Sequence, residues 1–298
     1  MILVAGSANL DFVVRAPHIP APGETVLGRE FRTFAGGKGA NQAIACARAG
    51  AAATQMLLAL GNDPFADPIE NSLRAAAVRT HVVRVDQPTG TAFICVADNA
   101  ENAITVAPGA NNALRASHLP SLDGISHLLM QLETPLDTVI AYADAARSNG
   151  VKVVLNAAPA QALPRELLAL LDVLVVNEGE LAAVSAHTGN VVQCLERIDV
   201  PCVVVTLGDR GSCARVSGAM ITQQPFAVTA IDTTAAGDTF CGVLVAALSR
   251  NCGMIEALRQ ANAAGALACT VPGAQSSIPT HARLQSFLHN QGRSIASL

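Results

Sequence analysis

The middle of the chain alternates short apolar, β-branched runs with longer helix-like segments. The β-branched runs lie at residues 151–155, 173–176 and 202–206. The helix-like segments lie at residues 136–148, 164–171 and 191–198. Runs that are apolar on both faces are typical of parallel strands buried between two layers of helices. The sequence therefore predicts an α/β fold with a doubly wound, mostly parallel sheet, whose ligands bind at the carboxyl ends of the strands.

Residues 232–240 read Asp-Thr-Thr-Ala-Ala-Gly-Asp-Thr-Phe and lead into an apolar segment that is typical of a buried helix. Small residues let the backbone approach a ligand closely, and the first-turn N–H groups of a helix attract anions. Asp238, which follows Ala235, Ala236 and Gly237, could then take the proton of a hydroxyl that attacks a phosphate held there. The alternative is an ordinary helix start, because acidic residues are common at that position.

A second glycine-rich segment, residues 34–51, runs into an alanine-rich helix. Its strong side-chain donors are Lys38 and Asn41, and Asn9 and Asp11 are expected nearby at the end of the first strand. These groups suit the hydroxyls of a sugar. The alternative is a helix entry with a flexible loop; finding both glycine-rich motifs in one chain favours the binding site.

Two nucleotide-binding motifs do not fit these segments. A Walker loop would need glycine where Arg32 stands and Ser or Thr where Gly39 stands. A dinucleotide fingerprint would need a second glycine in register after the first strand, and residues 6–11 lack it. The phosphate chemistry is therefore expected at Asp238 and not at the amino-terminal glycines.

Residues 12–34 and 89–106 interrupt the alternation of strands and helices. Two β-like runs, residues 91–96 and 103–106, flank a turn-like segment at residues 98–102. The two regions are expected to form a small antiparallel sheet outside the main one. Such a sheet cannot bury all of its apolar side chains alone, so we expect two copies to pair into a homodimer. The side chains in question are Phe12, Val14, Phe31, Phe34, Phe93, Ile94 and Val96.

Composition agrees with a soluble, cytoplasmic enzyme built on a single domain, residues 1–298. No apolar run reaches the roughly 18 residues that a membrane span needs, and the amino terminus lacks a basic export signal. The eight Cys form no C-x-x-C pair, so buried free thiols are expected. The net charge of -4 does not indicate a basic surface for nucleic acid, so no nucleic-acid binding is expected. With 51% hydrophobic residues but no Trp and one Tyr, the core should consist of small aliphatic side chains.

Motifs spread over nearly the whole chain resemble the ribokinase branch of the PfkB carbohydrate kinase family. They are GSANLD, PAPGETV, GGKGANQA, LLMQLETPL, LNAAPA, NEGE, TLGDRG, DTTAAGDTF and GAQSSIP, in the family's order. The resemblance implies a three-layer α/β/α fold with a β lid over the sugar site. It also implies ATP-dependent transfer of phosphate to the 5-hydroxyl of D-ribose, with Mg²⁺ and a monovalent cation such as K⁺.

The resemblance assigns roles residue by residue. The catalytic group would be the base Asp238 with the anion-binding turn Ala235, Ala236 and Gly237. Residues implied to bind the sugar are Asn9, Asp11, Gly37, Lys38, Asn41 and Glu133, together with Asp238. Residues implied to bind the nucleotide, in part through magnesium, are Asn177, Glu180, Thr206, Gly208, Gly211, Gly237 and Asn262. Residues implied to hold potassium are Asp232, Thr234, Ala268, Val271, Gly273 and Ser277.

Three positions depart from the family pattern, and two other functions remain open. Ala157 stands where Pro is frequent, Pro272 where a basic residue is usual, and Ala235 where the wider family has Gly. Pro272 could alter the potassium loop, because proline removes a donor and fixes φ. The substrate could instead be deoxyribose, a nucleoside or another small sugar, and a sensor without catalysis could keep the same fold.

Overall fold

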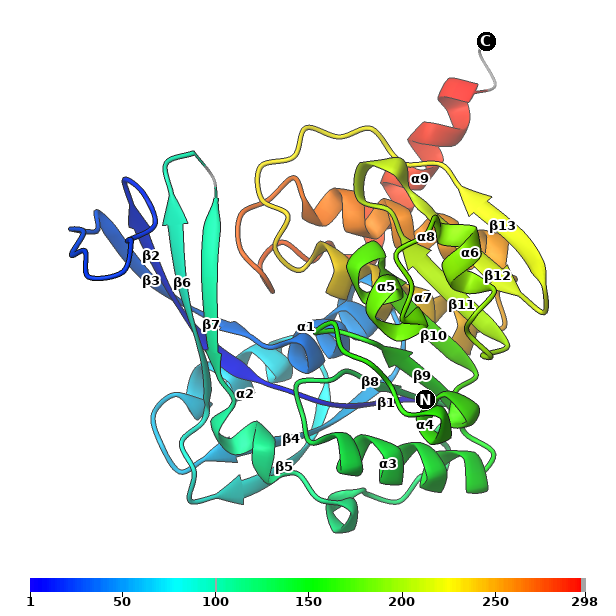
Figure 1. Ribbon diagram of the computed structural model, residues 1–298, viewed down its shortest axis with the longest axis horizontal. Helices are drawn as coiled ribbons and strands as arrows, with labels where there is room; N and C mark the ends of the chain where they lie inside the picture. The colour runs from blue at the N-terminus through cyan, green and yellow to red at the C-terminus, as the bar shows by residue number, and fades with distance from the viewer. Residues whose placement is uncertain (100, 296–298) are drawn as a thin grey trace.

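The computed structural model describes residues 1–99 and 101–295, in which thirteen strands form two sheets. Ala100, within the predicted turn at residues 98–102, and residues 296–298 of the predicted single domain lie outside the described residues. A large twisted sheet forms the body of the molecule, and the smaller sheet projects from one side of it (Figure 1).

The large sheet, which has nine strands among the described residues, is mostly parallel. Its parallel strands, in spatial order, are β11 (Cys202–Thr206), β10 (Val173–Asn177), β9 (Lys152–Asn156), β8 (His127–Met130), β1 (Ile2–Ala5), β4 (Thr54–Gly61) and β5 (Arg79–Val85). Two antiparallel strands, β12 (Ser212–Val216) and β13 (Ala219–Gln223), extend the β11 edge. The predicted strands and the mostly parallel sheet are confirmed.

Helices cover both faces of this sheet, because successive side chains of its strands enter two different cores. On β1, Ile2 and Val4 pack into one hydrophobic cluster, and Leu3 and Ala5 pack into the other. The first face carries α1 (Lys38–Ile44) with a π-helical turn (Ala45–Ala49), α2 (Ala66–Ala75), α7 (Ala236–Ser249), α8 (Met254–Ala268) and α9 (His281–Ile295). The second face carries α3 (Leu136–Ser148), α4 (Arg165–Leu170), α5 (Glu178–Ser185) and α6 (Val191–Leu195). Short 3₁₀ turns lie at Gly109–Ala113, Ala116–His118 and Gly208–Arg210.

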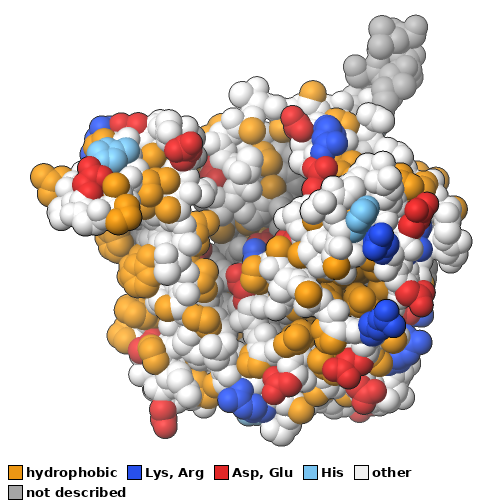
Figure 2. Space-filling model, in the orientation of Figure 1, with side chains coloured by type: hydrophobic (Ala, Val, Ile, Leu, Met, Phe, Trp, Pro, Cys, Tyr) orange, Lys and Arg blue, Asp and Glu red, His pale blue; other side chains and the backbone are white. Residues whose placement is uncertain are grey.

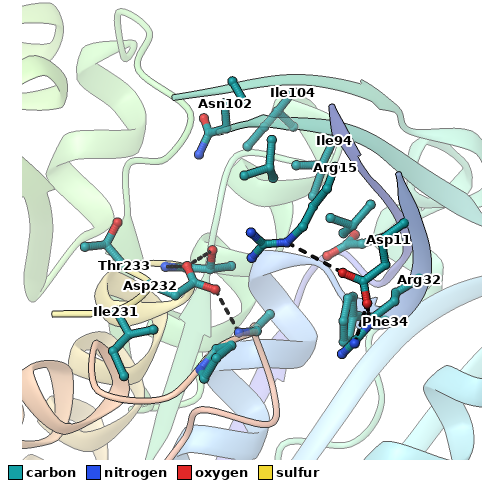
Figure 3. A pocket seen from close by; sticks show the side chains of 18 of the residues that line it. Asp11, Arg15, Arg32, Phe34, Ile94, Asn102, Ile104, Ile231, Asp232 and Thr233 are labelled. Carbon is teal, nitrogen blue, oxygen red and sulfur yellow. Dashed lines mark hydrogen bonds and ion pairs between the residues drawn. The ribbon is translucent and has the colours of Figure 1, made fainter. Parts of the chain in front are cut away.

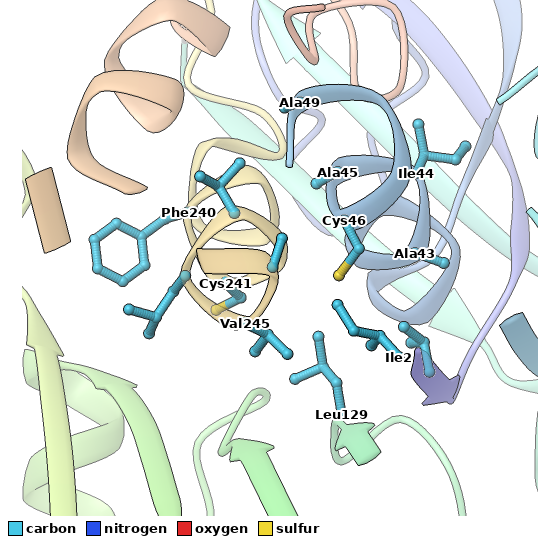
Figure 4. Packing of buried hydrophobic residues seen from close by; sticks show 14 of the residues in the cluster. Ile2, Ala43, Ile44, Ala45, Cys46, Ala49, Leu129, Phe240, Cys241 and Val245 are labelled. Carbon is cyan, nitrogen blue, oxygen red and sulfur yellow. The ribbon is translucent and has the colours of Figure 1, made fainter. Parts of the chain in front are cut away.

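Helices α1 and α7 pack closely through small side chains, as the composition predicted (Figure 4). A Cβ atom at Gly242 of α7 would lie 2.6 Å from the backbone oxygen of Gln42 and 2.5 Å from the Cβ atom of Ala45. The Cys46 thiol donates to the Gly242 carbonyl over 3.3 Å. The missing side chain at Gly242 therefore lets the two helices approach, and this sets the position of Asp238 relative to α1.

The strand order reverses at β1. From β1 the chain continues outward to β4 and β5, and later returns to β8 on the other side of β1 before moving outward to β11. A crevice at the carboxyl ends of the strands forms at such a switch point. Residues that follow Ala5 and Met130 therefore lie at the position where α/β folds bind ligands.

The small sheet is the second sheet that was predicted from residues 12–34 and 89–106, and we call it the lid. Its order is β3 (Glu30–Gly36), β2 (Asn9–Ala16), β6 (Gly90–Ala97) and β7 (Asn102–Ala107). The pairs β2 with β3 and β6 with β7 are antiparallel hairpins, and a parallel pairing of β2 with β6 joins them. The lid also begins at Asn9 and not at Phe12, because β2 starts at the crevice and carries its polar residues up into the lid.

Within the described part of the chain, all eight cysteines are free thiols, and Cys46, Cys194, Cys202, Cys213 and Cys241 are buried. Burial raises the pKa of the Cys46 thiol to about 12. These cysteines therefore pack as small apolar residues. None of the described helices combines the length and the apolar character that crossing a membrane would require.

Candidate active site

A pocket of about 170 Å³ lies at the carboxyl ends of β9, β10 and β11, next to the start of α7. It gathers predicted site residues that are far apart in the sequence: Lys38, Asn177, Glu180, Thr206, Ala235, Gly237 and Asp238. Asn156, Ala158, Val175, Val176 and Cys241 complete its wall. The structure therefore brings the two glycine-rich motifs into one site.

Asp238 occupies the first turn of α7 and is held by two side-chain amides from α1. Asn41 Nδ2 donates to Asp238 Oδ2 over 2.9 Å, and Gln42 Nε2 donates to Asp238 Oδ1 over 2.9 Å. The preceding Ala235 has left-handed backbone angles, φ 57° and ψ 11°. Gly237 and Asp238 in this first turn of α7 line the pocket, and first-turn N–H groups of a helix have no partner four residues back within the helix. The arrangement places a helix start, which attracts anions, beside a carboxylate.

The loop before α1 packs directly on the segment that follows β1. Gly37 has a φ of 88°, and a Cβ atom there would lie 2.7 Å from the Cα atom of Ala8. Glycine therefore serves both the left-handed conformation and the close approach. Glu133, which follows β8, accepts hydrogen bonds from Ser7 Oγ at 2.6 Å and from the Lys38 backbone N–H at 3.3 Å.

Charges gathered in this crevice shift the acidity of its side chains. Burial, with Glu133 and Asp238 nearby, raises the pKa of Asp11 to about 7. Burial alone would lower the pKa of Lys38, but the carboxylates of Asp238, Glu133 and Glu180 outweigh it and raise that pKa. Burial raises the pKa of Glu180, although the Asn177 N–H and Lys38 oppose the shift. The site thus concentrates carboxylates around the partly buried ammonium of Lys38.

Asn177 and Glu180 form a reciprocal cap at the start of α5. Glu180 donates its backbone N–H to Asn177 Oδ1, and Glu180 Oε2 accepts the Asn177 N–H, each over 2.8 Å. The next strand ends at Thr206, which also lines the pocket. Both side chains of the cap are therefore fixed at the rim before any ligand binds.

The remaining predicted nucleotide residues lie outside the lining of this pocket. Gly208 and Gly211 adopt positive φ angles of 61° and 86° in the turn after β11. The Asn262 amide on α8 donates to Ser212 Oγ over 2.6 Å. This amide therefore contacts the β12 strand and not the space beside Asp238.

The predicted cation residues lie in two neighbouring loops that Asp232 joins. Asp232 Oδ1 accepts from the N–H and the hydroxyl of Thr234 at 2.9 and 2.6 Å, and Asp232 Oδ2 accepts from the Gly273 N–H at 2.8 Å. Partial burial would raise the pKa of Asp232, but these hydrogen bonds outweigh it and lower that pKa. The carboxylate is therefore ionised and ties the loop before α7 to the loop after α8.

The other residues of the predicted cation set lie at the end of α8 and in the loop after it. The Ala268 carbonyl accepts from the Val271 N–H over 3.2 Å, and Ser277 Oγ donates to the Ala274 carbonyl over 2.7 Å. Among the described residues, no group of three or more His, Cys, Asp or Glu side chains is placed to hold a metal ion. Any cation bound here would therefore rest on backbone carbonyls with one carboxylate.

A larger cleft of about 690 Å³ separates the inner face of the lid from these loops (Figures 2 and 3). Asp11 lies at its base, and Phe34, Ile94 and Val96 face into it. Glu30 pairs with Arg15 at 3.9 Å and with Arg32 at 2.6 Å on the same face.

The outer face of the lid is aromatic. Phe12 stacks on Phe31 and Phe93, with ring centroids 6.0 and 5.3 Å apart, and contacts Phe65 edge-on at 5.4 Å. Phe31 and Phe93 remain 60% and 53% exposed. The seven apolar lid residues named from the sequence thus do not share one surface, because the pleat sends Phe34, Ile94 and Val96 into the cleft.

Comparison with known proteins agrees with this geometry. A sequence model described as "pfkB family carbohydrate kinase" matches residues 1–281. The chain belongs to this family. A ribokinase from Haemophilus influenzae is 40% identical over 97% of this chain and 98% of its own length. A crystal structure of ribokinase from Thermotoga maritima is 36% identical with a TM-score of 0.89, covering 97% of this chain and 99% of that one.

A third relative of this family carries ligands. The structure of Arabidopsis thaliana ribokinase complexed with ribose and ATP is 32% identical with a TM-score of 0.85, covering 96% of this chain and 98% of that one. The PfkB resemblance and the ribokinase-like fold predicted from the motifs are therefore confirmed.

Two polar residues that contact the predicted site residues escaped the sequence analysis. Ser7 is fully buried and joins Glu133 to the Gly39 N–H, which lies 3.3 Å from Ser7 Oγ. Asn111 donates to Asn9 Oδ1 over 2.8 Å and accepts the Ala8 N–H over 3.0 Å. Their signal was weak, because Ser and Asn are common in loops and only the fold brings them against the predicted residues.

Proposed function

We propose that the protein is an ATP-dependent ribokinase that transfers the γ-phosphate to the 5-hydroxyl of D-ribose, giving D-ribose 5-phosphate. The observation that carries the proposal is Asp238 at the start of α7, beside open helix N–H groups and held by Asn41 and Gln42. Relatives named ribokinase at 32–40% identity, and one structure bound to ribose and ATP, support ribose as the substrate.

In the proposed reaction, Asp238 accepts the proton of the 5-hydroxyl as the phosphoryl group arrives. In the turn Ala235, Ala236 and Gly237, the N–H groups of Ala235 and Gly237 have no hydrogen-bond partner among the described residues and can face the negative charge that develops on the transferred phosphate, whereas the Ala236 N–H donates to the Thr233 carbonyl over 3.2 Å. The proton leaves late in a loose phosphoryl transfer, so a well-placed carboxylate suffices as the base. Positioning and charge stabilisation supply most of the catalysis.

The proposed sugar-binding residues are Asn9, Asp11, Gly37, Lys38, Asn41 and Glu133. The Asn41 amide supports this role, since its Nδ2 donates to Asp238 while its buried Oδ1 has no hydrogen-bond partner among the described residues. A buried, unpaired acceptor is costly unless a ligand hydroxyl satisfies it. Such groups reject a sugar that lacks the matching hydroxyl.

The proposed nucleotide site comprises Asn177, Glu180, Thr206, Gly208, Gly211, Gly237 and Asn262. Glu180 is 7% exposed and its Oε2 is already bonded to the Asn177 N–H, which suits a carboxylate that holds magnesium through water. When bound with ATP, Mg²⁺ would neutralise charge on the nucleotide phosphates. The Lys38 ammonium lies in the same pocket and adds a fixed positive charge.

We also propose that a monovalent cation such as K⁺ binds at the loops tied by Asp232. The donor set Asp232, Thr234, Ala268, Val271, Gly273 and Ser277 offers carbonyl, hydroxyl and carboxylate oxygens, which suit hard cations. Bound there, the cation would order the loops beside the turn at Ala235. Turnover in potassium should then exceed turnover in a large organic cation at equal ionic strength. Equal rates would exclude activation, and Pro272 would be the first residue to replace.

The aromatic outer face of the lid supports a homodimer. Phe12, Phe31 and Phe93 form a stacked patch whose outer two rings are more than half exposed. Pairing two lids would cover this patch and protect the exposed strand edges. We accordingly propose that residues 1–298 act as one kinase domain whose lid also forms the dimer contact. Free thiols and the use of ATP are consistent with the cytoplasm.

A substrate panel with ATP and Mg²⁺ tests the proposal. D-ribose should give the highest kcat/KM, ahead of deoxyribose, other pentoses, fructose and nucleosides, and the product should carry phosphate on carbon 5. A higher kcat/KM for a nucleoside or another sugar would reassign the enzyme within its family. Sugar binding without turnover on any substrate would indicate a sensor.

A further inference from the structure

Behind Asp238 lies a chain of buried amides that the proposed reaction does not itself use. Gln42, the residue after Asn41 on α1, is fully buried, and so is Gln131, which directly follows β8. Gln42 Nε2 donates to Asp238 Oδ1 at 2.9 Å and to Asn156 Oδ1 at 3.0 Å. Gln131 Nε2 donates to Gln42 Oε1 over 2.6 Å. Every hydrogen-bonding atom of the Gln42 amide is therefore engaged.

The direction of this chain is fixed at its far end. Asn156 Nδ2 donates to the backbone carbonyl of Val175 over 3.2 Å, so the Asn156 oxygen must face Gln42. The Gln42 NH₂ group must then face both Asn156 and Asp238, and its oxygen must face Gln131. A reversed Gln42 amide would set its oxygen against two other oxygens in a buried site. The network therefore admits one orientation of Gln42.

Close helix packing makes this contact possible. Gly242 lies one turn after Asp238 on α7, and its missing side chain allows α1 to approach within contact of α7. Asn41 and Gln42 thereby reach one oxygen each of the same carboxylate. Asn41 also faces the proposed sugar site, whereas Gln42 lies wholly inside the protein. Binding and release of the sugar can disturb the contact between Asn41 and Asp238 but leave the contact between Gln42 and Asp238 in place.

We propose that Gln42, fixed by Gln131 and Asn156, is a positioning residue that sets the rotation of the Asp238 carboxylate toward the attacking hydroxyl. The inference rests on the proposed role of Asp238 as base. Gln42 contributes no charge and does not contact substrate. It fixes a carboxylate that must accept a proton in one direction, and a misplacement of about 1 Å can reduce the rate about a hundredfold. The effect should therefore appear in kcat and not in either KM.

The test compares Gln42→Met with a matched control, Gln55→Met. Gln55 is also a buried glutamine, paired with His81 at the opposite end of the sheet. Gln42→Met should lower kcat by about tenfold to a hundredfold and change the KM for D-ribose and for ATP by less than about threefold. Gln55→Met should leave all three constants near those of the wild type. A folded Gln42→Met enzyme with kcat within about twofold of wild type would overturn the proposal.

Gln42→Glu supplies a readout that a merely structural role would not move. The charged groups facing Asp238 are Lys38 from α1, Asp11 from β2 and Glu180 from α5, and none of them changes in this variant. A second carboxyl beside Asp238 should shift the acidic limb of the plot of kcat against pH to higher pH, by about one unit or more. An unshifted profile in this variant would contradict direct contact between residue 42 and the base.

Gln131→Met carries the test if Gln42→Met fails to fold. The Gln131 side chain holds Gln42 and does not itself contact Asp238, so its loss should have a smaller effect than Gln42→Met. The kcat should fall by about threefold to tenfold, with both KM values retained. An unchanged kcat in folded Gln131→Met would exclude the chain as a positioning device. Failure of the proposed function is distinguishable, since Asp238→Asn would then retain turnover or the wild type would phosphorylate no sugar.

Discussion

The two ends of the active site are built differently. At the proposed phosphoryl-transfer end, Asp238 accepts hydrogen bonds from two amides on α1, and Glu180 accepts one from the Asn177 N–H at the end of β10. At the lid end, the ion pairs Arg15 with Glu30 and Arg29 with Asp98 join exposed side chains on a four-stranded sheet outside the main core. Exposed pairs stabilise a structure by only about 0.2–1 kcal/mol. The comparison indicates that the proposed phosphoryl-transfer groups are fixed by buried hydrogen bonds, whereas the lid proposed to cover the sugar carries exposed ion pairs that add little stability.

Replacing the base should have the largest effect, because Asp238 is the carboxylate that Asn41 and Gln42 both hold, and neither Glu180 nor Glu133 shares those contacts. Asp238→Asn should lower kcat by about 10²–10⁴-fold, the range for loss of a general base, with both KM values within a few-fold. Steady-state kinetics with D-ribose and ATP measures this. Asp144→Asn, which replaces an exposed carboxylate on α3, serves as the control and should retain wild-type kcat. Near-normal turnover in Asp238→Asn would remove Asp238 from the mechanism.

Replacing Asp11, which lies between the two ends of the site, should have the next largest effect. This effect is on the free energy of unfolding and on its dependence on pH. The pKa of Asp11 is about 7 in the folded protein against 3.8 for the free side chain. Between these values the folded state binds a proton that the unfolded state has lost. Stability from this group is therefore fully present below pH 3.8 and is lost as pH rises through 7. The loss amounts to about 1.4 kcal/mol per pH unit at most.

Asp11→Asn should remove that slope. Urea unfolding at several pH values between 5 and 7 would measure the free energy of unfolding of both proteins. The difference between variant and wild type should grow toward neutral pH by about 2–3 kcal/mol in favour of the variant. If the free energy of unfolding has the same pH dependence in Asp11→Asn and in the wild type, burial does not hold Asp11 protonated.

Neighbouring residues on β6 separate the two faces of the lid. Phe93→Glu charges the outer aromatic patch and should convert the proposed dimer into a 30.5 kDa monomer by light scattering. Ile94→Glu charges the face that lines the cleft, so it should leave assembly intact and raise the KM for D-ribose by about tenfold. A monomeric wild type with full activity would exclude a role for dimerisation. Dissociation by Ile94→Glu and not by Phe93→Glu would reverse the assignment of the faces.

The sequence could predict the buried strands of the main sheet and the motif residues of the pocket. The buried strands at residues 152–156, 173–177 and 202–206 were predictable, because parallel strands between two helix layers are apolar on both faces. The motif residues Lys38, Glu180 and Asp238 were predictable by resemblance, and the fold brings them into one pocket.

Side-chain direction was not predictable. Period-two alternation shows that Phe93 and Ile94 face opposite ways but not which of them faces the cleft. The roles of Gln42 and Gln131 depend on partners 89 and 196 positions away along the chain. Hydrogen bonds of that separation leave no local pattern in a single sequence, so these contacts emerge only from the folded structure.

The smallest effect should come from the strained turn at the fixed end. Ala235 has a φ of 57°, where a residue with a Cβ is disfavoured by roughly 1–2 kcal/mol and glycine is not. Ala235→Gly removes this strain but loosens the unfolded chain, which costs about 0.4–1 kcal/mol. The free energy of unfolding in urea should therefore rise by up to about 1 kcal/mol. Ala236→Gly, at the first helical residue, is the matched control and should lower stability by about 0.5–1 kcal/mol. If Ala235→Gly lowers the free energy of unfolding as much as Ala236→Gly does, the turn stores no strain. The proposed phosphoryl-transfer end would then be no more strained than the lid.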